Sequence, residues 1–232
     1  MSYLSYLSDD KFTEIVRETL LKAKKGISEA EKNMYRNAID PFSFAFEMAA
    51  FEIDCMESWK LQEKRRQAQK TLQNQIGLFH QSVLGSISGW ENMGTGSEID
   101  LVNDSLKKIA EIKNKYNTVK GSDLSGLYDK LDRLVMQKNS KYKDYTAYYV
   151  EIIPKKGLRY NECFAPSDSS KGAVKSKNEK IRKIDGYSFY NMAANKQDAL
   201  RELFLAVKKV ICAEFEYRLN DEQDLERIFE KT

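Results

Sequence analysis

Hydrophobic and polar positions follow two different periods along the chain, and the change falls near residue 90. In the first part, apolar residues recur three or four positions apart over 12–20 and 42–56, which predicts two amphipathic helices. Asp40 and Pro41 supply an N-cap and a first-turn proline for the second helix. The polar stretch 61–75 contains few helix breakers, so we expect helical structure to continue through it.

After a glycine-rich connection, the runs become shorter and compatible with β-strands. Residues 99–101 and 109–112 predict two antiparallel strands, joined by a turn at 103–105. Helical spacing returns over 124–135. The β-branched and aromatic run 145–153 predicts a further strand, which a proline ends.

The remaining sequence predicts one long loop and one last helix. Segment 154–183 holds glycine, proline and a serine cluster, which is typical of a long functional loop. Asn195 is a good N-cap residue for a core-facing helix that would run to Ile211. These elements predict an α/β (α+β) fold in which a mixed central β-sheet is flanked by helices, behind a helical N-terminal region.

Length and composition indicate an ordinary globular protein. The 232 residues are 41% hydrophobic and 31% charged, and we expect one domain over 1–232. Within it, 1–90 would be mainly helical, and 91–232 would form the core and carry the basic loop 154–183. The sequence contains no apolar run of membrane-spanning length and no secretory signal, so we expect a cytoplasmic protein without membrane contact.

Histidine and cysteine usage excludes several kinds of site. The chain has a single histidine, His80, whereas zinc hydrolases and metal-finger nucleases need several histidine or cysteine ligands. We interpret His80 as a structural residue. Cys55, Cys163 and Cys212 are odd in number and far apart, so we expect reduced thiols, with Cys55 and Cys212 packed on helices.

The net charge of +3 does not by itself indicate nucleic-acid binding, but the charged residues are unevenly distributed along the chain. Segment 155–183 carries nine Lys or Arg against three acids, and segment 60–70 carries five against one. The balance reverses over 214–231, where seven acids face three bases. Local basic patches on a balanced surface are typical of a phosphate-binding cleft, although a solvated face with scattered lysines has the same composition.

The candidate chemistry lies on the predicted pair of strands. Residues two apart on a strand share a face, so Glu111 and Lys113 project together while Ala110 and Ile112 face the core. A hairpin brings the carboxylate of Asp100 beside that pair. Two carboxylates suit Mg²⁺, which would polarise a scissile phosphate and lower the pKa of an attacking water. Lys113 would orient or deprotonate that water; the alternative is a solvent-exposed pair of charges without function.

The identity of the metal ligands stays partly open at this point. Glu98 has the same strand parity as Asp100 and competes with it for the role of first acid. We favour Asp100 because it lies nearer the partner strand. A helical acid, Glu47 or Glu52, is a candidate outer metal ligand, and the alternative for each is a surface or capping charge.

The acid, the hairpin and the E-x-K triplet resemble the PD-(D/E)xK nuclease superfamily. The chain resembles more closely the type II restriction endonucleases that cut GGNCC or GGWCC sequences. The resemblance covers about residues 39–211, and its most specific part is IAEIKNKYNTVKG at 109–121. The other matching stretches are 39–43, 66–74, 76–81, 89–90, 152–156 and 184–190. No proline precedes the first acid here, which is a departure from the superfamily motif.

This resemblance implies a function. It implies a homodimeric, Mg²⁺-dependent hydrolase that cuts double-stranded DNA and leaves 5′-phosphates, with a DNA methyltransferase as functional partner. Position by position, Asp100 matches the first acid, Glu111 the second and Lys113 the lysine.

DNA contacts are expected from residues just beyond the catalytic strand and from the basic segments. Asn and Gln suit adenine edges, whereas Lys and Arg suit guanine, and most basic residues contact only phosphate. The candidates are Asn114, Lys115, Asn117, Thr118, Lys120, Lys155, Lys156, Arg159, Lys171 and Arg182, with Gln69 and Lys70 on the glutamine-rich helix.

Two other functions fit the same residues. One is a repair or recombination nuclease of the same fold, which would recognise DNA ends or junctions instead of a sequence. The other is a non-catalytic DNA-binding protein in which Glu111 and Lys113 form only a surface pair.

Overall fold

The computed structural model describes residues 2–33, 39–168, 172–215, 217 and 222–230. The chain divides into two compact units, one made of Met1–Val16 with Phe79–Thr232 and the other of Arg17–Leu78. The helices and strands are α1 (Asp9–Asn33), α2 (Pro41–Ala50), α3 (Met56–Leu84), β1 (Glu91–Asn92), β2 (Leu101–Asn103), β3 (Lys108–Lys115), α4 (Gly121–Met136), β4 (Thr146–Ile153), the 3₁₀ turn η1 (Lys155–Gly157), β5 (Asn161–Cys163), β6 (Ser167–Asp168), β7 (Ala173–Val174), β8 (Ile181–Asp185), α5 (Gly186–Ala194), α6 (Ala199–Phe215) and α7 (Glu222–Glu230).

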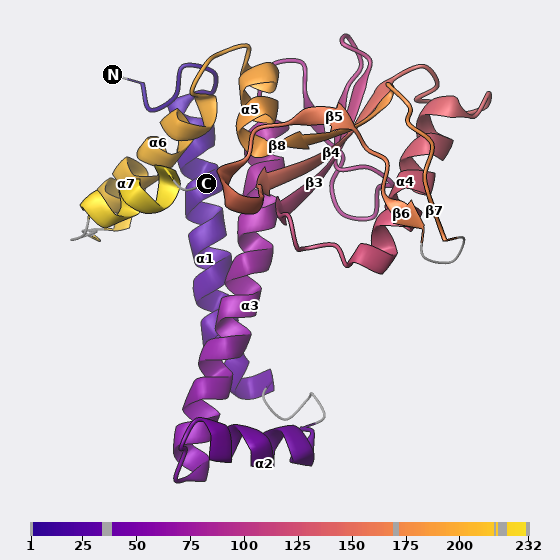
Figure 1. Ribbon diagram of the computed structural model, residues 1–232. Helices are drawn as coiled ribbons and strands as arrows, with labels where there is room; N and C mark the ends of the chain where they lie inside the picture. Colours follow the sequence, from indigo (N-terminus) through magenta and orange to yellow (C-terminus); the bar gives the residue numbers. More distant parts are fainter. Residues whose placement is uncertain (1, 34–38, 169–171, 216, 218–221, 231–232) are drawn as a thin grey trace. The chain divides into compact units, whose positions relative to one another are not determined.

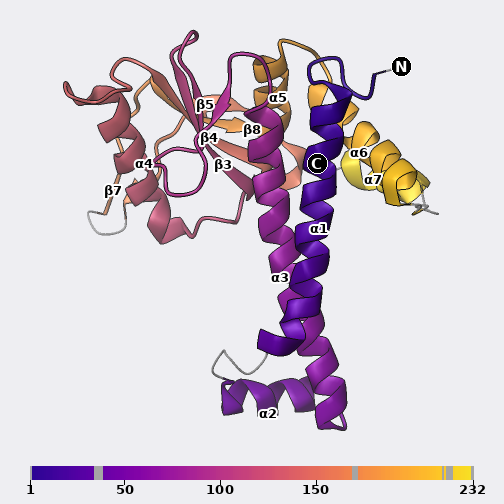
Figure 2. The same ribbon diagram turned by 180° about the vertical axis from the view of Figure 1, so that it is seen from behind.

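The larger unit is built on a mixed sheet of six strands in the order β1-β2-β3-β4-β8-β5, as far as the described residues go. β1, β2 and β3 are antiparallel, β3, β4 and β8 run parallel, and β5 returns antiparallel to β8. The expected mixed sheet with flanking helices is therefore confirmed. Figures 1 and 2 show α4 on one side of this sheet and α5 on the other.

The two faces of the sheet have separate hydrophobic layers. Helix α4 packs Leu127, Leu131 and Val135 against the face that carries Ile109 and Tyr149. On the opposite face, Phe189 of α5 contacts the rings of Tyr148 and Trp90. A Cβ at Gly186 would overlap the backbone of Ile152, so the absent side chain lets α5 begin directly against β4.

The smaller unit is helical, as its sequence predicts. Asp40 caps α2 by accepting a hydrogen bond from the Phe42 amide, and Pro41 occupies the first turn. The polar stretch 61–75 lies inside the continuous helix α3. Trp59 and Ile53 form the small core of this unit with Phe44 and Met48.

Segment 154–183 is wrongly predicted as one long loop. It contains η1, β5, β6 and β7, and β8, at its end, lies between β4 and β5 in the sheet. β8 is only five residues long, and its burial pattern does not alternate, so its lysine and arginine side chains make it look like part of a polar loop. Lys183 bonds to a buried carboxylate while Ile181 and Ile184 are buried.

Asn195 is wrongly predicted as the N-cap of the last helix. It ends α5 in the left-handed conformation, with φ 48° and ψ 44°, and α6 begins at Ala199. Asparagine suits both positions, because its short polar side chain tolerates the left-handed region. The sequence pattern missed α5 as a separate helix, so it assigned this asparagine to the wrong end.

Cys55 and Cys212 are exposed, against the expectation that they pack on helices, and all three cysteines are free. His80 is buried and its Nδ1 bonds to the Tyr190 hydroxyl at 2.8 Å, which agrees with a structural role. Burial lowers the pKa of His80 to about 4, so the ring is uncharged at neutral pH. No helix in the described ranges is long and apolar enough to cross a membrane.

Candidate active site

The register of the β2–β3 hairpin places two carboxylates opposite each other. Leu101 pairs with Ala110, so one further step along the antiparallel ladder sets Asp100 against Glu111. Side chains in such positions have Cβ atoms about 5 Å apart. The pair that the sequence predicts is therefore brought together by a hairpin with a short turn.

Glu111 is held between two lysines. Its side chain has only 10% of its surface exposed, and its two oxygens accept separate hydrogen bonds. Lys113 donates to Oε1 at 2.7 Å, and Lys130 of α4 donates to Oε2, also at 2.7 Å. Lys113 lies on the same face of β3 as Glu111, as strand parity predicts. No sequence pattern indicates Lys130, because only the packing of α4 on this face brings it to the hairpin.

Asp100 is half-buried beside this group. Its Oδ2 accepts a hydrogen bond from the backbone N–H of Ile112 at 2.7 Å, which fixes the carboxylate against the partner strand. Burial raises the pKa of Asp100, and the neighbouring charge of Glu111 raises it further. The hydrogen bond from Ile112 and the charges of Lys113 and Lys130 oppose that rise. The two carboxylates therefore repel each other at short range.

The other predicted metal ligands lie elsewhere. Glu98 is on the surface, with 58% of its side chain exposed, and pairs with Arg133 at 2.7 Å. Glu47 belongs to the helical unit, where its Oε2 accepts a hydrogen bond from Trp59 Nε1 at 2.9 Å. Glu52 is exposed in the turn after α2. Of the two acids that the sequence leaves open, the geometry favours Asp100 over Glu98. Among the described residues, no group of three His, Cys, Asp or Glu could hold a metal ion.

A second polar group lies on the same face, where the parallel strands end. The register aligns Lys113 with Glu151 and Glu151 with Asp185 across β3, β4 and β8. Glu151 is buried, accepts a hydrogen bond from the Tyr160 hydroxyl and pairs with Lys183 at 3.1 Å. This group was not predicted from the sequence. A detectable signal was the single acid inside the apolar run of β4.

Asp185 has a structural task within this group. Its two carboxylate oxygens accept hydrogen bonds from the amides of Tyr160 and Ser188, at 2.9 and 3.0 Å. It thereby caps the N-terminus of α5 and fixes the segment before β5. The ammonium of Lys183 lies over the rings of Tyr149 and Tyr160, at 5.8 and 5.2 Å from their centroids.

Comparison with known proteins decides the family. A family model described as Eco47II restriction endonuclease matches residues 4–214. The chain belongs to this family. It is 47% identical over 211 residues to the type II restriction enzyme Eco47II of Escherichia coli, which covers 91% of this chain and 87% of that protein. It is 28% identical over 205 residues to the type II restriction enzyme Sau96I of Staphylococcus aureus, with 87% and 77% covered.

This member of the Eco47II family is a type II restriction enzyme, which cleaves DNA at specific sites. The function inferred from the sequence is confirmed at that level. The two other readings of the sequence, a structure-specific repair nuclease and a non-catalytic DNA-binding protein, do not hold.

Five of the predicted DNA-contacting residues of this Eco47II-family enzyme follow the candidate catalytic lysine directly. Asn114 and Lys115 end β3, and Lys120 is the residue before α4. Asn117 lies in the turn between them. That turn is closed by the Thr118 amide, which donates to the Lys115 carbonyl, and by the Thr118 hydroxyl, which accepts from the Lys115 amide.

The remaining candidates lie in different surroundings. Lys155 and Lys156 are exposed in η1, where Lys156 has a φ of 55°, and Arg159 stacks on the Tyr187 ring at 4.4 Å. Arg182 is engaged by Glu179 and Asn161, so it ties β5 to β8. Gln69 and Lys70 are exposed on α3 in the helical unit, and Lys171 lies outside the described residues.

Proposed function

We propose that this restriction enzyme hydrolyses double-stranded DNA in a Mg²⁺-dependent reaction through Asp100, Glu111 and Lys113, and leaves 5′-phosphate ends. One observation carries the assignment: Glu111 faces Asp100 across the hairpin and holds the ammonium of Lys113 at 2.7 Å. The resemblance seen in the sequence extends the proposal to a short palindrome of the GGNCC type. A DNA methyltransferase for the same sequence would be the functional partner, in the cytoplasm.

The chemistry of the donors fits magnesium. Carboxylate oxygens are the hard ligands that Mg²⁺ prefers, and it usually takes only one or two from the protein, with water and substrate oxygens completing its shell. Burial first, and the charge of Glu111 second, raise the pKa of Asp100, and a cation between the two carboxylates would offset both effects. When bound, Mg²⁺ would polarise the scissile phosphate and make an attacking water more acidic.

The chain's own residues divide the remaining work. Asp100 and Glu111 would hold the metal, with Asp100 fixed by the amide of Ile112. Lys113 would orient the attacking water and offset the negative charge that develops on the phosphate in the transition state. Its ammonium reaches this position from β3, which lies between β2 and β4 in the sheet and pairs with β4 at Lys113 itself.

DNA contacts would come from two places on the larger unit. The turn 114–120 directly follows Lys113, so its asparagine and lysine side chains lie nearest in sequence to the cutting centre. Lys155 and Lys156 follow β4, which runs parallel to β3 and ends at the same edge. We assign Arg182 a structural part, because Glu179 and Asn161 already bind its guanidinium.

The test of the proposed function is a digestion of plasmid DNA of known sequence. We expect discrete fragments with 5′-phosphate ends when Mg²⁺ is present and none when EDTA removes it. Sequencing of the fragment ends would then give the target. A random smear, or cutting that persists in EDTA, would contradict the proposal.

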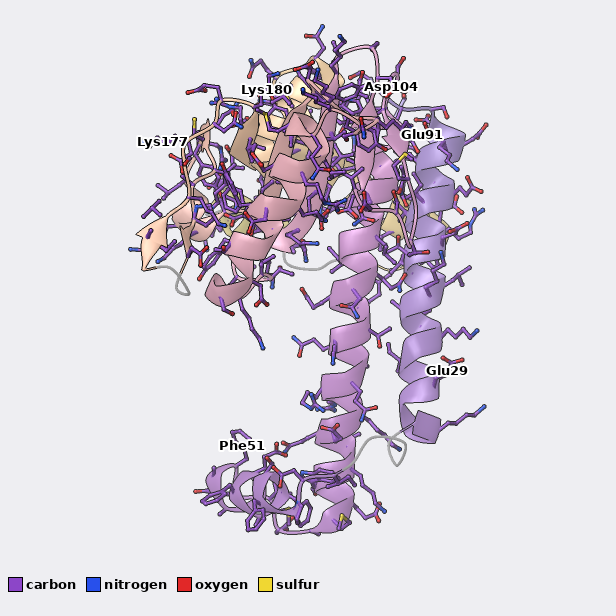
Figure 3. All side chains as sticks on the ribbon, turned by 90° about the vertical axis from the view of Figure 1, so that its right-hand side faces the viewer. Glu29, Phe51, Glu91, Asp104, Lys177 and Lys180 are labelled. Carbon is purple, nitrogen blue, oxygen red and sulfur yellow. The ribbon has the colours of Figure 1, made fainter. Side chains whose placement is uncertain are left out.

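A two-fold symmetric target also predicts a homodimer, and α2 offers a surface for it. Phe42, Phe46 and Phe51 are 75%, 75% and 66% exposed, and Glu47, the only charge of α2, is bound to Trp59. Figure 3 labels Phe51 at the end of this helix. Three such rings expose on the order of 400 Å². A standard interface buries about 800 Å² per partner, so this aromatic surface would supply about half of the area a dimer needs. We propose that a second copy of the chain covers it, since within α2 the one charged side chain, Glu47, is already bound to Trp59.

Removing two of these rings should weaken the dimer. We expect Phe42→Ser with Phe46→Ser to raise the dimer dissociation constant at least about tenfold, because buried aromatic anchors carry much of an interface's binding energy. Sedimentation equilibrium would measure the change. The matched control is Leu106→Ser with Val174→Ser, which removes two exposed apolar side chains from the larger unit. A wild-type protein that is monomeric, or a dimer that the phenylalanine changes leave intact, would refute this interface.

A further inference from the structure

Lys130 is the one residue at the candidate site that neither the strand pattern nor the E-x-K triplet accounts for. It comes from α4, a separate element, and donates to Glu111 Oε2 at 2.7 Å. Its side chain is 30% exposed, so it reaches the buried carboxylate from the solvent side. Lys113 holds the other oxygen of the same carboxylate.

The charges of the group balance without a metal. Asp100 and Glu111 contribute two negative charges, and Lys113 and Lys130 contribute two positive ones. A divalent cation at the carboxylates would leave the group with an excess charge of +2, and it would compete directly with an ammonium for an oxygen of Glu111. A carboxylate oxygen can accept more than one partner, but a cation on Glu111 repels both ammonium groups, and the phosphates of DNA are the anions that can receive one of them.

Lys130 is better placed than Lys113 to make this exchange. Lys113 extends from β3, where it pairs with Glu151 of β4, and is two residues from Glu111 on the same strand face. Lys130 extends from α4, 19 residues from Glu111 along the chain, so its flexible side chain can leave the carboxylate without any change in β3. Moving the Lys130 head group therefore requires only side-chain rotation.

We propose that Lys130 is a positioning residue, which occupies Glu111 Oε2 before metal binds and transfers to a DNA phosphate when the metal takes that oxygen. This inference rests on the proposed function, because it needs Glu111 to be a metal ligand. It adds a second lysine, from a different element, to the cutting centre. It also makes metal binding and DNA binding favour each other. A DNA phosphate draws the Lys130 ammonium away from the metal ligand Glu111, and the metal frees that ammonium to bind the phosphate.

The test compares Mg²⁺ binding with cleavage in Lys130→Met, which keeps the methylene stem and removes the charge. Without DNA, titration calorimetry should show Mg²⁺ bound roughly two- to fivefold more tightly than in the wild type, because the competing ammonium is gone. With DNA, cleavage should fall about 10–100-fold, the range typical when a partner of a metal ligand is lost. Lys130→Arg, which keeps a cation on Glu111, should return Mg²⁺ affinity toward the wild-type value.

The matched control is Lys180→Met. Lys180 donates to Asp144 at 2.6 Å and is 40% exposed, but this pair precedes β8 and β4, away from the ends where Lys113 and Glu151 lie. It should change neither Mg²⁺ affinity nor cleavage. Unchanged or weaker Mg²⁺ binding in Lys130→Met would overturn the proposal. The Mg²⁺ titration does not depend on cleavage activity. If the wild type binds Mg²⁺ through Asp100 and does not cut DNA, the proposed function is refuted, and the titration of Lys130→Met still tests the role of Lys130.

Discussion

Lys113→Ala should lower the rate of DNA cleavage by about 10²–10³-fold, the cost typical of removing one preorganised group that stabilises transition-state charge. Binding of the target should persist, because Lys113 contributes one of many positive charges near the DNA. The measurements are single-turnover cleavage with Mg²⁺ and filter binding with Ca²⁺ in its place. The ratio of the two effects separates a role in chemistry from a role in binding.

The control for this variant is again Lys180→Met, whose ion pair has a similar length, 2.6 Å against 2.7 Å, and is more exposed. Full cleavage by Lys113→Ala would show that its pair with Glu111 is only structural. Equal losses of binding and cleavage would assign Lys113 to DNA contact.

Asp100→Asn should abolish cleavage while it stabilises the metal-free protein at neutral pH. The asparagine oxygen can still accept the hydrogen bond from the Ile112 amide, so the hairpin keeps its geometry. The substitution removes a carboxylate that burial and Glu111 both disfavour in its charged form. Cleavage should fall about a hundredfold or more, because a metal ligand is lost.

The pH dependence of this effect has a definite sign. The pKa of Asp100 is raised in the folded protein, so its contribution to stability is complete below the unfolded pKa and is lost as the pH rises through the folded pKa. The melting temperature of Asp100→Asn should therefore exceed that of the wild type by a margin that grows from acid to neutral pH. Magnesium should remove this difference in melting temperature, because it stabilises only the wild type. A variant that melts below the wild type at neutral pH without metal would contradict this account.

The sequence predicts most of the hairpin and its chemistry because those features are local. Strand parity places Glu111 and Lys113 on one face, and a short turn brings Asp100 to them. The ambiguity with Glu98 could not be removed in the same way, since parity is identical for both acids. The register of the hairpin and the pairing of Glu98 with Arg133 distinguish the two candidates for the first acid.

What the sequence could not predict depends on contacts between distant segments. Lys130 reaches Glu111 only because α4 packs over that face of the sheet. β8 reads as part of a loop until its parallel pairing with β4 buries Ile181 and Ile184. Propensity and periodicity describe neighbours along the chain, and they carry no information about which strand pairs with which.

The four charged groups of the candidate site, from Asp100 to Lys130, come from one continuous stretch of the chain. Bringing them together requires closing only short loops, whose entropic cost is small. Of the segments that we propose for DNA contact, the turn 114–120 lies inside that stretch and η1 lies outside it, as does the self-association surface at α2. A mutation at η1 can therefore change a DNA contact and leave all four charged groups in place, whereas the turn 114–120 is inherited together with them.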